Sequence, residues 1–211
     1  MNLKKGLFDR KGDPARIAHD AEHASGLMAE EIVSLLPSVG TQPIVVACIG
    51  TDRSTGDSLG PLIGTLLEEK NPANFFVYGT LEDPIHAVNL AEKLAMIEEK
   101  HPNPFVIGID ACLGRMKSVG VIQVGNGPVK PGAGVNKELQ AVGNMHITGI
   151  VNVSGFMEFF VLQNTRLNLV LKMARTMSEG LYEASLHYQR KQSWFQMKLT
   201  QDAELKRTPF Q

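Results

Sequence analysis

The chain has 211 residues, of which 43% are hydrophobic and 20% are charged, and its 21 basic and 22 acidic side chains give a formal net charge of −1. This balance argues against a nucleic-acid-binding protein, which normally carries clustered basic residues. A chain of this length also buries a core without help from disulfides, so the sequence predicts an ordinary globular protein with one main domain.

Neither a membrane span nor a secretory signal is predicted. The longest apolar run, residues 44–49, is far shorter than the roughly 18 residues of a membrane helix, and the N-terminus lacks the apolar centre of a signal peptide. We therefore expect a cytoplasmic protein with no membrane partner. Its two cysteines, Cys48 and Cys112, are too few for a disulfide framework and are expected to be buried thiols.

In chain order, helical spacing of apolar residues predicts a first helix over 16–36, and the apolar segment 43–49 predicts a strand buried on both faces. Further helices are predicted at 58–70, 85–100, 136–141 and from 167 to about 188, and further strands at 75–78, 105–109, 119–124 and 146–153. This alternation predicts an α/β domain with a mostly parallel sheet between two helical layers, a three-layer α/β/α architecture.

We expect residues 1–188 to form this single domain and residues 189–211 to form a polar C-terminal tail without helical periodicity. The tail carries Trp194, Phe195 and Phe210. Burying large aromatic side chains is favourable, and a mobile tail would leave them exposed to water, so we expect them to dock on the domain or on a partner subunit.

Two loops at the carboxyl ends of predicted strands are candidates for a functional site, since ligands of open α/β sheets bind at these ends. The first spans residues 50–61 and contains Asp57 and Ser58, and the second begins at Asp110. The first is not a phosphate loop, because Asp57 stands where that motif needs a lysine, and the dinucleotide pattern of three glycines is missing too. No nucleotide or other cofactor is expected.

Two other motifs suggest alternative chemistries. Residues 56–60 read Gly-Asp-Ser-Leu-Gly and match the Gly-x-Ser-x-Gly pattern of serine hydrolases, but Ser58 follows the strand by nine residues, and a helix N-cap is its simpler role. Residues 19–23 match the His-x-x-Glu-His pattern of inverted zinc peptidases with His19 and His23 on one helix face, although no third ligand is evident. We expect no metal.

The aspartates of the two loops form the leading candidate site. Asp57 and Asp110 follow two strands of one sheet, so their carboxyl groups converge if those strands are neighbours. Two close carboxyls cannot both ionise cheaply, so they would share one proton and could activate water and protonate a carbonyl or leaving group. The alternative is that both are only capping and turn residues.

Three separated segments give the chain a family resemblance: residues 49–61, residues 108–111 and the Pro-Gly-Ala-Gly-Val-Asn-Lys-Glu-Leu stretch at 131–139. In this order they resemble the germination protease of spore-forming bacteria. The whole chain is similar to the YyaC-type sporulation proteins, a compact relative of that protease, and both resemble the hydrogenase maturation endopeptidases in fold.

The resemblance implies a phosphorylase/hydrolase-like fold and a sporulation-associated, aspartate-dependent endopeptidase with Asp57 and Asp110 as catalytic residues. It also implies that Gly132, Gly134 and Lys137, together with Ser58, contact a peptide or protein substrate, with a spore protein as one candidate. The forespore or spore would then be its compartment, and assembly into a homo-oligomer is one possible state of the protein. The alternatives are a non-catalytic sporulation binding or scaffold protein on the same fold, and an esterase dependent on Ser58.

Overall fold

A computed structural model describes residues 13–38, 40, 42–132 and 139–205. Its centre is a six-stranded sheet in the order β1-β5-β6-β4-β2-β3. Strands β2, β3, β4 and β6 run parallel, and β5 is antiparallel to both of its neighbours. The strands are β1 (Ala15–Ala18), β2 (Ile44–Cys48), β3 (Phe75–Tyr78), β4 (Phe105–Gly114), β5 (Val121–Asn126) and β6 (Met145–Val153).

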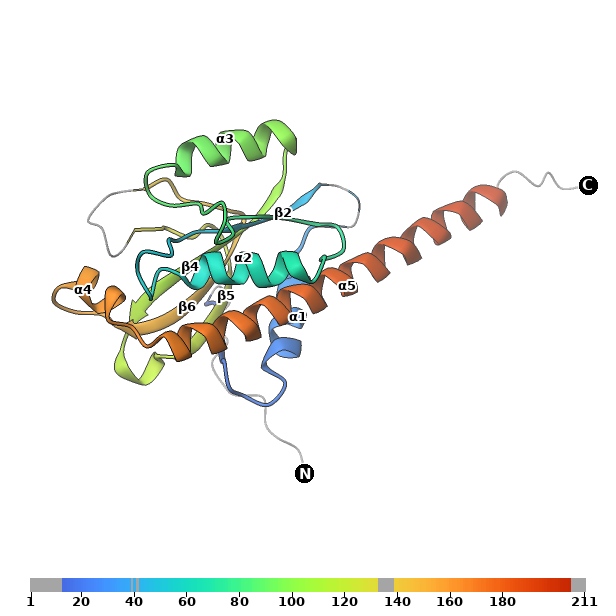
Figure 1. The fold of residues 1–211 in the computed structure, drawn as a ribbon. Coiled ribbons are helices and arrows are strands. Elements are labelled where there is room, and N and C mark those ends of the chain that lie inside the picture. Colours follow the sequence, from blue (N-terminus) through green and yellow to red (C-terminus); the bar gives the residue numbers. More distant parts are fainter. Residues whose placement is uncertain (1–12, 39, 41, 133–138, 206–211) are drawn as a thin grey trace, which may run out of the picture.

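Helices cover both faces of the sheet, which confirms the three-layer α/β prediction (Figure 1). Of the helices in the described residues, three pack on one face and one packs on the other, over β2, β3 and β4. On the first face lie α1 (Ala24–Leu35), α2 (Leu59–Glu69) and α5 (Leu167–Leu205), and on the second lies α3 (Leu90–Lys100). A short helix α4 (Glu158–Gln163) and a 3-10 turn (Met116–Ser118) connect the remaining elements.

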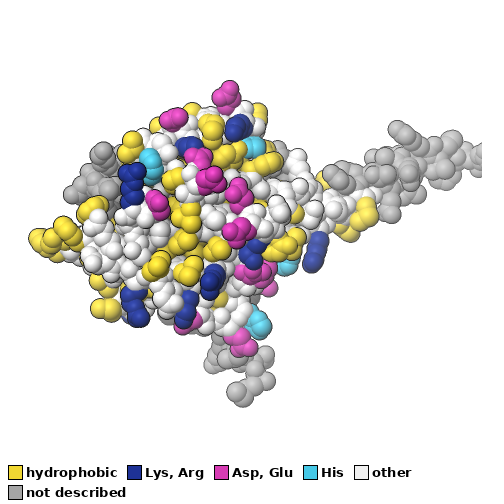
Figure 2. All heavy atoms as spheres, in the orientation of Figure 1, with side chains coloured by type: hydrophobic (Ala, Val, Ile, Leu, Met, Phe, Trp, Pro, Cys, Tyr) yellow, Lys and Arg dark blue, Asp and Glu magenta, His cyan; other side chains and the backbone are white. Residues whose placement is uncertain are grey.

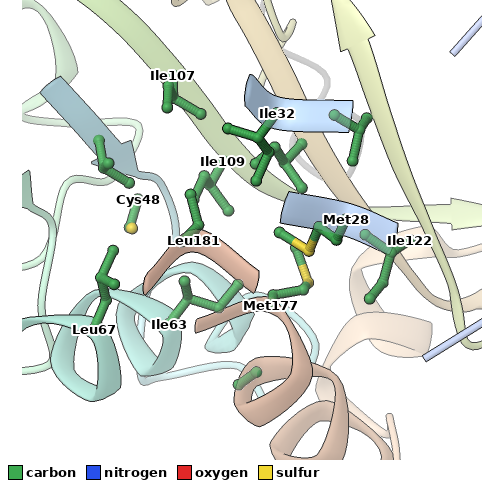
Figure 3. Close-up of a cluster of buried hydrophobic side chains, with 14 of the residues drawn as sticks. Met28, Ile32, Cys48, Ile63, Leu67, Ile107, Ile109, Ile122, Met177 and Leu181 are labelled. Atoms are coloured by element: carbon green, nitrogen blue, oxygen red, sulfur yellow. The ribbon is translucent and has the colours of Figure 1, made fainter. Parts of the chain in front are cut away.

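The two helical layers explain why β2 is entirely apolar. Side chains alternate between the faces of a strand, so Val46 joins the larger core beneath α1, α2 and α5, and Val45 joins the smaller core beneath α3. The larger core is drawn in Figure 3, where Met28 and Ile32 of α1 and Ile63 and Leu67 of α2 surround Cys48 of β2 and Ile107 and Ile109 of β4.

Several element boundaries differ from the sequence prediction. The helix predicted over 16–36 is wrong at its start, because residues 15–18 pair with β5 as an edge strand and the helix begins only at Ala24. The helix predicted over 85–100 likewise begins at Leu90. Strand β4 continues to Gly114, so Asp110 lies within a strand rather than after one. Of the helix predicted at 136–141, residues 136–138 lie outside the described residues, and residues 139–141 are not helical.

The C-terminal segment also differs from expectation. Residues 189–205 continue α5 as one helix that extends away from the body (Figure 1). Trp194 and Phe195 are 60% and 45% exposed, so they do not dock on the domain of their own chain, and Phe210 lies outside the described residues. Among the helices of the described residues, none has the length and apolar character needed to cross a membrane.

Candidate active site

The loop between β2 and α2 folds back on itself and presents Asp57. The Gly50 amide donates a hydrogen bond to the Ile85 carbonyl, and the Thr51 amide donates to the Asp57 carbonyl at 3.1 Å. The Gly56 amide donates to the Leu162 carbonyl at 2.9 Å, which ties the loop to α4. Asp57 is therefore held from both sides by backbone hydrogen bonds.

Glycines in this loop serve close packing rather than a serine-hydrolase turn. A Cβ atom at Gly60 would lie 2.0 Å from the Ile49 carbonyl oxygen, and one at Gly56 would lie 2.7 Å from a methyl carbon of Leu162. Gly50 has φ of +151°, and a Cβ there would lie 2.0 Å from the Asp57 carbonyl oxygen. The Gly-Asp-Ser-Leu-Gly string is thus explained by the approach of α2 and α4 to the end of β2.

Ser58 is turned away from the candidate site. Its side chain is buried, with only 7% of the residue exposed, and its hydroxyl donates to the Thr55 carbonyl at 2.7 Å. It occupies the N-cap position of α2 without capping a backbone amide, and it does not line the cavity described below. The geometry therefore corrects the expectation that Ser58 contacts substrate, and it gives no support to a nucleophilic serine.

Asp110 comes from the central strand β4. Its register partner in β6 is Thr148, and its own carboxyl oxygen Oδ1 accepts a hydrogen bond from the Ala111 amide at 2.9 Å. Because side chains alternate along β4, Ile109 and Ala111 enter the larger core while Asp110 and Cys112 face the opposite side of the sheet.

Both aspartates line one cavity, as their positions in the sequence predict. Its volume is about 100 Å³, enough for several water molecules. Gly132 also lines it, whereas Gly134 and Lys137 lie outside the described residues. Besides these, the wall consists of Ile49, Gly50, Thr51, His86, Ala87, Ala111, Cys112, Leu113, Pro131, Leu139 and Leu162. Residues on both sides of the undescribed segment 133–138 therefore reach the cavity.

Burial and mutual repulsion shape the acidity of the pair. Burial raises the pKa of Asp110 well above its ordinary value of 3.8, the negative charge of Asp57 raises it further, and the Ala111 amide lowers it in part. Burial also raises the pKa of Asp57, and the neighbouring Ser54 hydroxyl offsets part of that rise. Of the two, Asp110 therefore holds its proton more firmly.

Sequence reasoning missed two polar residues of the cavity. The sequence predicts a helix at His86, but His86 precedes α3. Its Nδ1 accepts a hydrogen bond from the Val88 amide at 3.3 Å, which leaves the proton of the neutral ring on Nε2. Cys112 is only half-buried rather than buried, and burial raises the pKa of its thiol to about 11. A sequence offers no signal for His86, because tertiary folding alone brings its loop to the aspartates.

The zinc-peptidase pattern at 19–23 does not form a site. His19 lies in a turn after β1, where its Nδ1 hydrogen-bonds the Gly120 carbonyl at 2.9 Å, and His23 has a left-handed backbone at the N-cap of α1. The two rings therefore do not share a helix face. Throughout the described part of the chain, no group of three or more His, Cys, Asp or Glu side chains is arranged to hold a metal ion.

Comparisons with known proteins give one family and two similar proteins. A family model described as "Protein of unknown function (DUF1256)" matches residues 16–180. A Bacillus subtilis (strain 168) protein titled "Uncharacterized protein YyaC" is 57% identical over 185 residues, which cover 86% of this chain and 89% of that protein. Among solved structures, the [NiFe] hydrogenase maturation protease HycI from Thermococcus kodakarensis KOD1 has a TM-score of 0.45 and 15% identity, covering 74% of this chain and 97% of that one.

Proposed function

This chain belongs to the DUF1256 family, and we propose that it is a peptidase of germination-protease type in which Asp57 and Asp110 activate water. One observation carries the proposal: two carboxyl groups from different elements line one cavity, and the negative charge of Asp57 raises the pKa of Asp110. A pair of this kind suits acid–base hydrolysis, because one member can be ionised while the other keeps its proton.

The higher pKa of Asp110 makes it the acid of the pair and leaves Asp57 as the base. Ionised Asp57 takes a proton from a water molecule, whose oxygen attacks the peptide carbonyl carbon, while neutral Asp110 gives its proton to the carbonyl oxygen. The resulting tetrahedral diol collapses as Asp110 recovers a proton from one hydroxyl and Asp57 gives its proton to the leaving nitrogen. The C–N bond breaks, an acid and an amine form, and both aspartates return to their starting states.

The substrate contacts and the biological setting rest on the resemblance of three segments to the germination protease. Gly132 borders the cavity, and we propose that it contacts the substrate, as do Gly134 and Lys137. A spore protein is the proposed substrate, and the forespore or spore is the proposed compartment.

Conservative variants test the assignment. Asp57→Asn and Asp110→Asn keep the shape of each side chain but remove the shared proton, and each should lower cleavage of acid-soluble spore proteins by about a hundredfold or more, measured by mass spectrometry of the fragments. Asp52→Asn is the matched control, because Asp52 is exposed in the same loop and does not line the cavity. Undiminished cleavage by either cavity variant would refute the proposal.

A non-catalytic binding or scaffold protein is the second candidate. It is favoured by large apolar side chains that stand exposed on α4 and on the extension of α5, such as Phe159 and Trp194. A well-folded protein that cleaves no spore protein between pH 4 and pH 8 would support this candidate. Short-chain ester hydrolysis that disappears in Ser58→Ala would instead support an esterase.

A further inference from the structure

A row of polar side chains crosses the sheet from the candidate active site to the opposite edge. Residues paired in register point to the same face of a sheet. Asp110 of β4 pairs with Thr148 of β6, Thr148 pairs with Gln123 of β5, and Gln123 pairs with Arg16 of β1. The Thr148 hydroxyl also lies 3.5 Å from the Gln123 side-chain oxygen. The row therefore joins Asp110 to Arg16 across four strands.

This row is the floor of a continuous groove. The cavity of the two aspartates shares Asp110 and Cys112 with a second cavity of about 270 Å³, which is lined by Gln123 and Thr148. A third cavity of about 400 Å³ also contains Gln123 and continues to Arg16. On this side of the sheet, the described residues provide one long helix, α3, and the core beneath it contains side chains of β2, β3 and β4 but none of β1, β5 or β6. The groove thus runs over β6, β5 and β1 without a helix above it.

The far end of the groove is basic. Arg16, Arg115 and Lys117 line the third cavity, and all three are exposed. Within the part of the chain that the structure describes, the ion pairs join other residues, and no carboxylate lies within 4.0 Å of these three cations. The Arg16 guanidinium donates a hydrogen bond to the Ser118 hydroxyl, at 3.0 Å. Three exposed cations without a carboxylate partner attract an anionic ligand.

Resting on the proposed function, we infer that this groove binds the polypeptide substrate in extended form, with an acidic side chain held by Arg16, Arg115 and Lys117. Three strand spacings of about 4.8 Å separate Asp110 from Arg16, which is about 14 Å or roughly four extended residues. The enzyme therefore selects substrates with Asp or Glu about four residues from the bond that is cut.

An acidic polypeptide fits this groove better than a nucleic acid does. A nucleic acid carries a phosphate at every residue, and its phosphates would meet the two aspartates at the other end. A polypeptide can place one acidic side chain over the cations and a neutral peptide bond over the aspartates. The charge difference between the two ends thus favours a chain whose own charge varies along its length.

Binding can be measured without cleavage in the Asp57→Asn background. The probes are two fluorescein-labelled peptides of about twelve residues, identical except that one carries a Glu pair and the other a Gln pair about four residues from a central apolar dipeptide. We expect the Glu peptide to bind about tenfold more tightly by fluorescence anisotropy, and Arg115→Glu/Lys117→Glu to abolish this preference. The control is Lys172→Glu/Arg175→Glu, which makes the same charge change on exposed residues of α5, on the other face of the sheet.

The outcomes separate the groove from the catalytic proposal. Equal binding of the two peptides would overturn the groove assignment, and so would tighter binding of a single-stranded oligonucleotide. A preference that survives in Arg115→Glu/Lys117→Glu, or that is undiminished in the milder Lys117→Gln, would overturn it as well. Cleavage by the wild type with no acidic residue enriched near the cuts would also overturn it, while leaving the peptidase intact. Charge-dependent binding without any cleavage would support the groove and refute the peptidase.

Discussion

Replacing Gly60 by alanine tests how the first aspartate is positioned. Gly60 lies in the first turn of α2, and an added Cβ would lie 2.0 Å from the Ile49 carbonyl oxygen, whereas real Cβ contacts are essentially never closer than 3.0 Å. Backbone must therefore separate from backbone by at least 1.0 Å, with no side-chain rotation to relieve the clash. Overpacking of this kind costs about 1–3 kcal/mol, and it moves α2 together with Asp57.

Gly26→Ala is the matched control, because Gly26 lies inside α1 and its added Cβ would meet nothing closer than 3.7 Å. Alanine stabilises a helix over glycine by roughly 0.5–1 kcal/mol at both sites, so the difference between the variants isolates the clash. We expect Gly60→Ala to melt roughly 2–12 °C below Gly26→Ala by calorimetry, with lower peptide cleavage. Equal melting temperatures and undiminished cleavage would refute the packing argument.

Three further predictions concern the cavity. Because the pKa of Asp110 is raised on folding, the stability that its proton confers is full below pH 3.8 and is lost as pH rises through the folded pKa. Denaturant unfolding should therefore find Asp110→Asn more stable than the wild type at pH 8 but not at pH 3.5. Equal differences in stability at both pH values would contradict this. Because the pKa of its thiol is raised to about 11, Cys112 should react slowly with iodoacetamide at pH 7, and the rate should rise about tenfold with each added pH unit. Mass spectrometry of the alkylated protein measures this rate, and a rate that does not change with pH would count against a raised pKa. Leu162→Ala should lower the free energy of unfolding by about 2–4 kcal/mol, since Leu162 is only 5% exposed. Phe156→Ala, at a residue that is 92% exposed, should change it by less than about 0.5 kcal/mol. Similar losses in the two variants would be inconsistent with the packing of α4.

The aspartate pair could be predicted from the sequence because it depends on strand order alone. The apolar segments 43–49 and 105–109 mark the two strands clearly, Asp57 lies in the loop after the first and Asp110 directly follows the second segment, and β2 and β4 are neighbours. Residues whose position depends on tertiary contacts could not be predicted. Residues 15–18 carry a helical apolar pattern, but their backbone pairs with β5, and no local pattern reveals that partner.

The groove shows a second limit of sequence reasoning. Arg16, Gln123, Thr148 and Asp110 are far apart in the chain, and each is an ordinary polar residue in its own segment. Only the strand order β1-β5-β6-β4 and the register of its three pairings bring them into one row. The extension of α5 was missed for a different reason, because residues 189–205 are polar enough to read as a tail although their backbone continues the helix.

The central claim is that Asp57 and Asp110 act as one coupled pair, and a carbon-13 NMR pH titration of the aspartate carboxyl groups tests it without any substrate. The signal of Asp110 should titrate well above its ordinary pKa of 3.8, and replacing Asp57 by asparagine should lower that pKa because a neighbouring negative charge is removed. An Asp110 signal that titrates near 3.8, or one that does not shift in the Asp57→Asn variant, would contradict the account.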